Sequence, residues 1–183
     1  RNGLAEAIKY GIIDDAALFK FIEQNHEKFL KGNPQVMTTI VKRCSQIKAR
    51  VVALDERETK GIRTILNFGH TVGHAVEAAA KYNQYHHGEA IGLGMRVASR
   101  ISVELGLLSR ADEARINALI SAVGLPEKIK SVGLTKILNT MRHDKKFVGG
   151  KNRFVLCSSI GKVVVWQGIP MPVIIDAIND YLI

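Results

Sequence analysis

The sequence has few of the features that mark secreted, membrane-spanning or disulfide-bonded proteins. Its two cysteines, Cys44 and Cys157, lie far apart, which excludes a disulfide-rich framework and a CxxC metal site. No apolar run approaches the roughly 20 residues that a membrane-spanning helix needs. No basic-then-apolar signal peptide opens the chain. We therefore expect a cytoplasmic protein with no membrane partner.

Aromatic residues and clustered basic residues are also scarce. Aromatics make up 6% of the chain, and the basic residues behind the net charge of +9 are scattered rather than gathered in an arginine-rich arm. Nucleic-acid-binding proteins concentrate such residues on one face, so no nucleic-acid partner is expected. Net charge bears on association rather than on fold. A basic solvated surface, or a site that attracts a small anion, accounts for it.

The chain lacks the alternating strands and helices, and the glycine-rich turn after a strand, that a Rossmann unit requires. Apolar residues instead recur at helical spacing over most of the chain up to residue 141. Two β-type runs, 153–159 and 162–166, flank a turn and predict a hairpin, and a last helix is expected from Pro172 to Leu182. The predicted fold is mainly α, one multi-helix domain over residues 1–183 with one small β-hairpin near the C-terminus.

Two histidines, His70 and His74, stand four residues apart in a segment, 62–82, that the pattern predicts to be helical. They would lie on one face of that helix, with His87 and Glu89 following shortly. A catalytic zinc site uses three protein ligands, and spacing alone makes His70 and His74 the first pair and His87 or Glu89 the third. No glutamate follows His70 directly, so the general base of a zinc metalloprotease is missing. A hydrogen-bonded histidine pair without metal is the alternative.

Further polar residues precede the two histidines at helical spacing. Arg63, Asn67, His70 and His74 step by four, three and four residues, which would place them in one polar stripe along the predicted helix. Solvent-facing helices are more often rich in lysine and glutamate. The stripe is therefore predicted to line a cleft.

Several segments resemble 3-dehydroquinate synthase, and they occur in matching order from the first residue nearly to the last. The segments are Arg1-Asn2-Gly3-x-Ala5-Glu6-x-Ile8-Lys9-Tyr10-Gly11, Lys48 with Asp55-Glu56-Arg57-Glu58, Arg63-x-x-Leu66-Asn67-Phe68-Gly69-His70-Thr71-x-Gly73-His74-Ala75-x-Glu77, His87-Gly88-Glu89-Ala90, and Asp144-Lys145-Lys146 before Gly150-Lys151. The resemblance implies that residues 1–183 form the C-terminal domain of a two-domain α/β enzyme. It also implies that the NAD-binding domain lies outside this sequence and that the fragment alone is inactive.

The resemblance, and not the spacing, assigns individual roles. It implies that zinc or cobalt is held by Glu6, His70 and His87, and that His74 lies beside the substrate and transfers protons. The substrate's carboxylate, phosphate and hydroxyls would be bound by Lys9, Lys48, Arg63 and Asn67. Glu58 would orient such a lysine, and Lys145 or Lys146, between which the resemblance does not choose, would close over the substrate.

The implied activity is that of an NAD-dependent carbon–oxygen lyase of the shikimate pathway to aromatic amino acids. It would convert 3-deoxy-D-arabino-heptulosonate 7-phosphate, a small anionic sugar phosphate, to 3-dehydroquinate and phosphate, as a homodimer in the full-length enzyme. Other sugar phosphate cyclases, which make 2-deoxy-scyllo-inosose or valiolone-type rings, are an alternative. A metal-binding helical module without turnover is another. Iron-type alcohol dehydrogenases share the two-domain plan, but their HGxxNA-like motif is absent.

Overall fold

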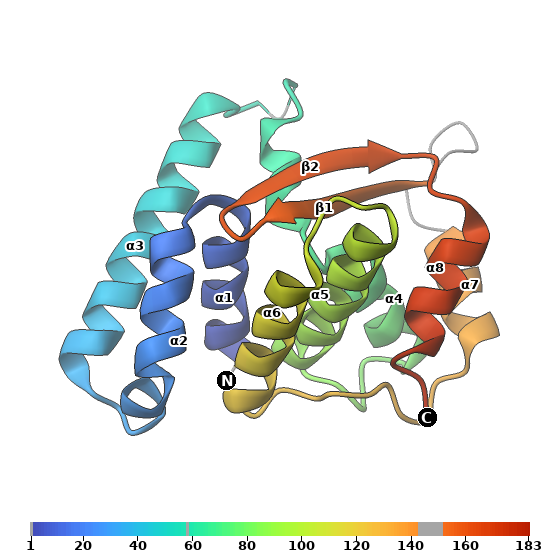
Figure 1. Cartoon of the computed structure of the whole chain (residues 1–183), viewed down its shortest axis with the longest axis horizontal. Coiled ribbons are helices and arrows are strands. Elements are labelled where there is room, and N and C mark those ends of the chain that lie inside the picture. Colours follow the sequence, from blue (N-terminus) through green and yellow to red (C-terminus); the bar gives the residue numbers. More distant parts are fainter. Residues whose placement is uncertain (1, 58, 143–151) are drawn as a thin grey trace.

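The computed structural model describes residues 2–57, 59–142 and 152–183, and it shows helices gathered beneath one two-stranded hairpin (Figure 1). The elements in chain order are α1 (Asn2–Asp14), α2 (Ala16–Leu30), α3 (Pro34–Leu54), the 3-10 helix η1 (Ile62–Asn67), α4 (His70–Ala79), α5 (His87–Glu104), α6 (Arg110–Ala122), α7 (Leu134–Arg142), β1 (Arg153–Ser159), β2 (Lys162–Gln167) and α8 (Met171–Asn179). The prediction of a mainly α fold with one small hairpin near the C-terminus is confirmed.

Capping residues in the sequence set several helix starts. The side chain of Asp15 accepts a hydrogen bond from the backbone N–H of Leu18 at 2.9 Å, which caps α2. Asn33 caps α3 in the same way, with Pro34 at its first position, and Ser109 caps α6. Short polar side chains satisfy amides that the first turn of a helix leaves without partners. These boundaries are therefore encoded locally.

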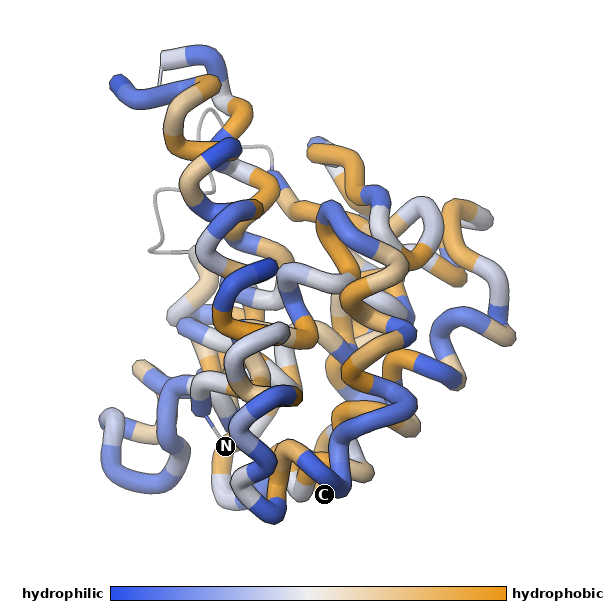
Figure 2. The backbone as a smooth tube through the Cα atoms, turned by 90° about the vertical axis from the view of Figure 1, so that its left-hand side faces the viewer, coloured by the Kyte–Doolittle hydropathy of each residue, from blue (hydrophilic) through white to orange (hydrophobic). Residues whose placement is uncertain are grey.

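Helix α5 is the centre of the core because apolar residues surround it on nearly all sides. One of its faces packs into a cluster with α1, α2 and α3, and another into a cluster with α4, α7 and α8. The amphipathic outer helices show as alternating hydrophobic and hydrophilic stretches along the tube in Figure 2. The fully buried α5 side chains that divide between the two clusters are Ile91 and Met95 on one side and Leu93, Val97 and Ile101 on the other.

The hairpin lies across one end of the helices (Figure 1), where β1 packs on α5 and β2 packs on α1. Its strands are antiparallel, paired from Arg153 opposite Gln167 to Ser159 opposite Lys162. At the turn, the backbone N–H of Gly161 donates a hydrogen bond to the Ile12 carbonyl at 2.8 Å. The hairpin therefore ties α1 to α5, the two helices that carry parts of the site described below.

Helices α4 and α5 approach each other so closely that only glycine fits at the crossing. A Cβ atom on Gly94 of α5 would lie 1.8 Å from the carbonyl oxygen of Gly69. Gly69 itself has a φ of +76°, in the left-handed region that favours glycine. This crossing sets how His70 on α4 and His87 on α5 face one another.

We expect Gly94→Ala to lower the free energy of unfolding by about 3 kcal/mol, because overpacking against backbone cannot be relieved by rotating a side chain. Gly92→Ala, on the same helix, is the matched control. There the added Cβ would lie 3.4 Å from Leu125 Cδ1, an ordinary contact. That variant is expected to be neutral or to gain about 0.5–1 kcal/mol from helix propensity. Urea unfolding of both measures the difference, and equal stabilities would contradict the close crossing.

The prediction of one continuous helix over 62–82 is wrong. The chain forms η1 as far as Asn67, becomes extended at Phe68 (φ −55°, ψ 128°), and turns through Gly69 into α4. Phe68 is fully buried and anchors this turn in the core. The polar stripe is therefore divided between two helical segments, with Arg63 and Asn67 on η1 and the two histidines on α4.

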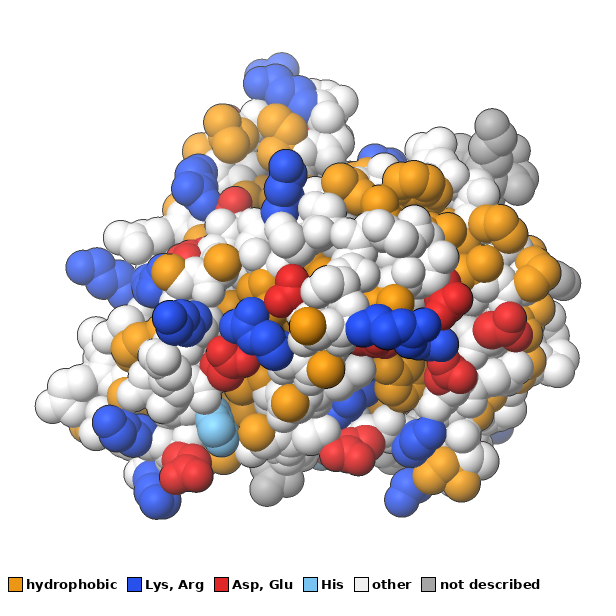
Figure 3. Space-filling model, viewed as in Figure 1, with side chains coloured by type: hydrophobic (Ala, Val, Ile, Leu, Met, Phe, Trp, Pro, Cys, Tyr) orange, Lys and Arg blue, Asp and Glu red, His pale blue; other side chains and the backbone are white. Residues whose placement is uncertain are grey.

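Charged side chains of both signs are mixed on one face of the molecule (Figure 3). On the face in Figure 3, lysine and arginine are spread among aspartate and glutamate, with orange apolar side chains between them. Within the described ranges, no helix combines the length and the apolar composition needed to cross a membrane.

Candidate metal and substrate site

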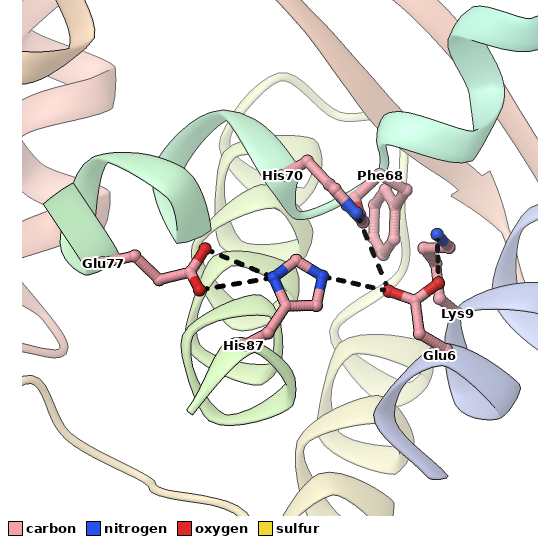
Figure 4. A network of polar contacts seen from close by, with 6 residues as sticks. All are labelled: Glu6, Lys9, Phe68, His70, Glu77 and His87. Carbon is pink, nitrogen blue, oxygen red and sulfur yellow. Dashed lines mark hydrogen bonds and ion pairs between the residues drawn. The ribbon is translucent and has the colours of Figure 1, made fainter. Parts of the chain in front are cut away.

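Glu6, His70 and His87 converge where α1, α4 and α5 meet (Figure 4). Atom Oε1 of Glu6 lies 3.7 Å from Nε2 of His70 and 3.8 Å from Nε2 of His87. One ligand-type atom from each residue lies within 4.8 Å of the others. The structure thus brings together, from three helices, the residues that the resemblance assigns to the metal.

The His70 ring is held by the chain just before it. Its Nδ1 lies 3.0 Å from the carbonyl oxygen of Phe68. A carbonyl only accepts hydrogen bonds, so Nδ1 donates, and the Nε2 lone pair of the neutral ring points toward Glu6. Burial and the charge of Lys9 lower the pKa of His70 to about 4. The ring is therefore neutral near pH 7, the form that binds metal.

The His87 ring is held by a carboxylate on a different helix. Its Nδ1 lies 3.3 Å from both carboxylate oxygens of Glu77 on α4. An ionised carboxylate also only accepts, so Nδ1 donates and Nε2 presents its lone pair toward Glu6. Both histidines thus direct the same type of atom to one place.

Lys9 occupies the other oxygen of Glu6. Its Nζ donates to Oε2 at 2.6 Å, and Lys9 is 3% exposed. Burial lowers the pKa of Lys9, and the negative charge of Glu6 opposes that shift. The ion pair fixes the Glu6 carboxylate with its Oε1 facing the two imidazoles.

The arrangement around Glu6 Oε1 fits a bound cation. This atom is buried and has no hydrogen-bond partner among the described residues. A buried acceptor without a partner is costly, and here it faces two further lone pairs. Ligand atoms in a tetrahedral zinc site, with bonds near 2.0–2.2 Å, stand about 3.3–3.5 Å apart. The 3.7 and 3.8 Å separations are close to that, so one glutamate and two histidines fit zinc or cobalt.

His74 lies between this cluster and a cavity. It is exposed on α4, with its ring centroid 5.1 Å from that of His70 and 6.0 Å from that of His87. With Glu77, Tyr82 and other side chains it lines a cavity of about 490 Å³, within the size range of small-molecule sites. His74, Glu77 and His87 also form a second group whose ligand-type atoms lie within 4.8 Å of one another.

Glu89, which spacing alone offered as a third ligand, has another task. Its carboxylate accepts a hydrogen bond from the backbone N–H of His86 at 2.8 Å. This reciprocal contact closes the first turn of α5. Glu89 belongs to neither of the two groups of candidate ligands.

The remaining predicted site residues that the structure describes lie on α3 and η1. Lys48 is exposed on α3, and its charge contributes to lowering the pKa of Lys9. Arg63 and Asn67 are half-buried on η1, which packs against α1 and α3 and leads directly into His70. The other three predicted residues, Glu58, Lys145 and Lys146, lie outside the described residues.

The structure makes clear the roles of two residues to which no role was assigned from the sequence. Glu77 holds His87, and it lies three positions after His74 on the same helix, a spacing that places both on one face. Asp55 is 2% exposed, and its carboxylate accepts from the backbone N–H groups of Lys60 and Ile62 at 2.9 Å. Asp55 thus fixes the turn that starts η1 and presents Arg63.

Residues 3–147 match the family model for the C-terminal region of 3-dehydroquinate synthase. The 3-dehydroquinate synthase of Desulforamulus reducens is 46% identical over 170 residues, covering 92% of this chain and 47% of that protein. That of Acidithiobacillus ferrooxidans is 41% identical over 182 residues, covering 100% of this chain and 50% of that protein. The chain thus spans about half the length of these relatives.

Solved structures of related enzymes share the fold. The 2-epi-5-epi-valiolone synthase of Streptomyces hygroscopicus superposes with a TM-score of 0.89 at 25% identity, over 98% of this chain and 50% of that one. A 2-deoxy-scyllo-inosose synthase superposes with a TM-score of 0.80 at 25% identity, over 99% of this chain and 52% of that one. With the sequence matches, these likenesses show that the chain belongs to the 3-dehydroquinate synthase family and corresponds to its C-terminal region.

Proposed function

We propose that this chain is the metal- and substrate-binding domain of a 3-dehydroquinate synthase, which converts 3-deoxy-D-arabino-heptulosonate 7-phosphate to 3-dehydroquinate and phosphate with NAD+ and zinc or cobalt. In this proposal residues 1–183 form the C-terminal domain, and the other half of the protein binds most of the NAD+. The observation that carries the proposal is that His70 and His87 converge on the buried Oε1 of Glu6, whose other carboxylate oxygen is paired with the buried Lys9.

The structural neighbours support the choice of cofactors. The valiolone synthase has NAD+ and Zn2+ bound, and the inosose synthase has carbaglucose-6-phosphate, NAD+ and Co2+ bound. Two imidazoles and one carboxylate are donors that both metals accept. In this chain Glu6, His70 and His87 would hold the ion.

The residues around the metal ligands suit an anionic substrate. A bound divalent ion would supply Lewis-acid polarisation of substrate hydroxyls, and NAD+ would supply hydride transfer. Lys9, Lys48 and Arg63 would bind the substrate's carboxylate and phosphate. Asn67 would bind a hydroxyl, and His74, which lines the cavity, would transfer protons.

Sequence identity favours the heptulosonate phosphate over the substrates of other cyclases. The chain is 41–46% identical to 3-dehydroquinate synthases and 25% identical to the two other cyclases. The heptulosonate phosphate carries a carboxylate as well as a phosphate, whereas the carbaglucose-6-phosphate bound to the inosose synthase has no carboxylate. A site with the buried Lys9, the half-buried Arg63 and the exposed Lys48 suits the doubly anionic compound better.

Phosphate release by the full-length protein that contains this chain tests the proposal. With NAD+ and zinc, we expect turnover of the heptulosonate phosphate and none of glucose 6-phosphate. Omitting NAD+ is the control and should abolish release. Turnover of glucose 6-phosphate alone would point to another cyclase. Zinc binding without release from either compound would leave only a metal-binding module.

A further inference from the structure

Glu77 has no part in the proposed function, yet it makes a closer contact with His87 than Glu6 does. We propose that Glu77 is a positioning residue for the metal site, which fixes the tautomer and ring orientation of His87 so that Nε2 faces Glu6 and His70. This inference rests on the metal site proposed above. It adds an orienting residue from a helix other than the one that carries the ligand.

The geometry shows why His87 needs such a partner. Its side chain is 46% exposed at the first position of α5, where little packing restrains the ring. The Glu77 side chain is 11% exposed and held on α4, with both oxygens 3.3 Å from His87 Nδ1. Figure 4 shows the His87 ring standing between Glu77 on one side and Glu6 on the other. A carboxylate on a largely buried side chain thus adds a restraint on a half-exposed ring.

The two metal-facing histidines are oriented by different acceptors. Nδ1 of His70 donates to the carbonyl of Phe68, two residues earlier in the chain. Nδ1 of His87 donates to a carboxylate from another element. A carboxylate partner fixes the tautomer and also makes the metal-facing nitrogen a stronger donor. The loss of Glu77 should therefore weaken the metal site without removing a ligand.

A competing role for Glu77 is as a ligand itself, in the group with His74 and His87. The Nδ1 of His87 cannot both donate a proton to Glu77 and bind an ion beside it. An ion in that second group would also leave Glu6 Oε1 buried, without a hydrogen-bond partner, facing the lone pair of His70. If Glu77 only positions His87, the ion binds between Glu6, His70 and His87 and contacts Glu6 Oε1. The structure therefore favours the positioning role.

Zinc affinity, measured by competition with a chelator, tests the role of Glu77. We expect Glu77→Ala to weaken zinc binding by about 10–100-fold, the usual effect of removing the partner of a metal-bound histidine. Glu77→Gln should recover much of this loss, because its amide oxygen can still accept from Nδ1. Its Co2+ absorption spectrum should match that of the unchanged protein. Glu113→Ala is the matched control, since Glu113 and Glu77 as whole residues are both 8% exposed on helices, but Glu113 belongs to neither ligand group.

Three outcomes separate the possible failures. If Glu77→Gln loses zinc as fully as Glu77→Ala and alters the Co2+ spectrum, Glu77 is a ligand and the positioning role is wrong. If Glu77→Ala binds zinc as tightly as the unchanged protein while His70→Ala does not, the metal site stands and this inference fails. If His70→Ala also binds zinc normally, the proposed metal site itself is wrong. Circular dichroism of each variant checks that it is folded.

Discussion

Replacing His70 with alanine is expected to weaken zinc binding by more than about 100-fold, beyond the range seen when only a ligand's hydrogen-bond partner is lost. The residue supplies one of three atoms around Glu6 Oε1, and an ion with two protein ligands left is held poorly. His70 is the cleanest of the three to remove. Glu6→Ala would also leave the buried Lys9 charge without its partner, which destabilises the fold in its own right.

Metal analysis of the purified protein, with about one zinc per unchanged chain, gives the readout for His70→Ala. His26→Ala is the control, because His26 lies on α2, bonded to the Glu23 carbonyl, and belongs to neither ligand group. It should keep full zinc content. Full zinc occupancy in His70→Ala, and likewise in Glu6→Ala and His87→Ala, would show that other residues hold the ion.

The fold could be predicted from the sequence where the deciding signals are local. Capping residues such as Asp15, Asn33 and Ser109 act within one turn, and the hairpin follows from two β-type runs around a short turn. The break between η1 and α4 was missed because it depends on tertiary packing. Phe68 is buried and Gly69 lies close against α5. The periodic spacing of apolar residues in the sequence does not reveal either contact.

The site could be predicted only in part, for a related reason. His70 and His74 stand out because they are four residues apart, but Glu6 comes from the first helix, and only the resemblance to a known family pointed to it. Spacing also offered Glu89, whose carboxylate caps its own helix instead. Glu77 had a usable signal, since it shares a helix face with His74. What the sequence could not show is that α5 presents His87 opposite that face.

Burial and contacts suggest different roles for the two histidines of α4. His70 is 12% exposed, has its Nδ1 bonded to the chain and faces Glu6. His74 is exposed and lines the cavity. A metal ligand must keep its lone pair on the ion, whereas a proton-transfer group must reach the substrate and exchange protons. Their spacing alone predicted that His70 and His74 both bind the metal. The structure instead makes His70 a candidate ligand and His74 a candidate acid–base group.

His74→Ala is therefore expected to keep its zinc while turnover of the heptulosonate phosphate by the full-length protein falls by about 100–10,000-fold, the usual contribution of a positioned acid–base group. Zinc content and phosphate release are measured on the same preparation, with His26→Ala as the control that should change neither. Added imidazole should restore part of the activity, since it can enter the cavity that the lost side chain lined.

A loss of zinc as large as in His70→Ala would instead make His74 a ligand. The ion would then lie with Glu77 and His87, because those are the only other donors grouped with His74 among the described residues.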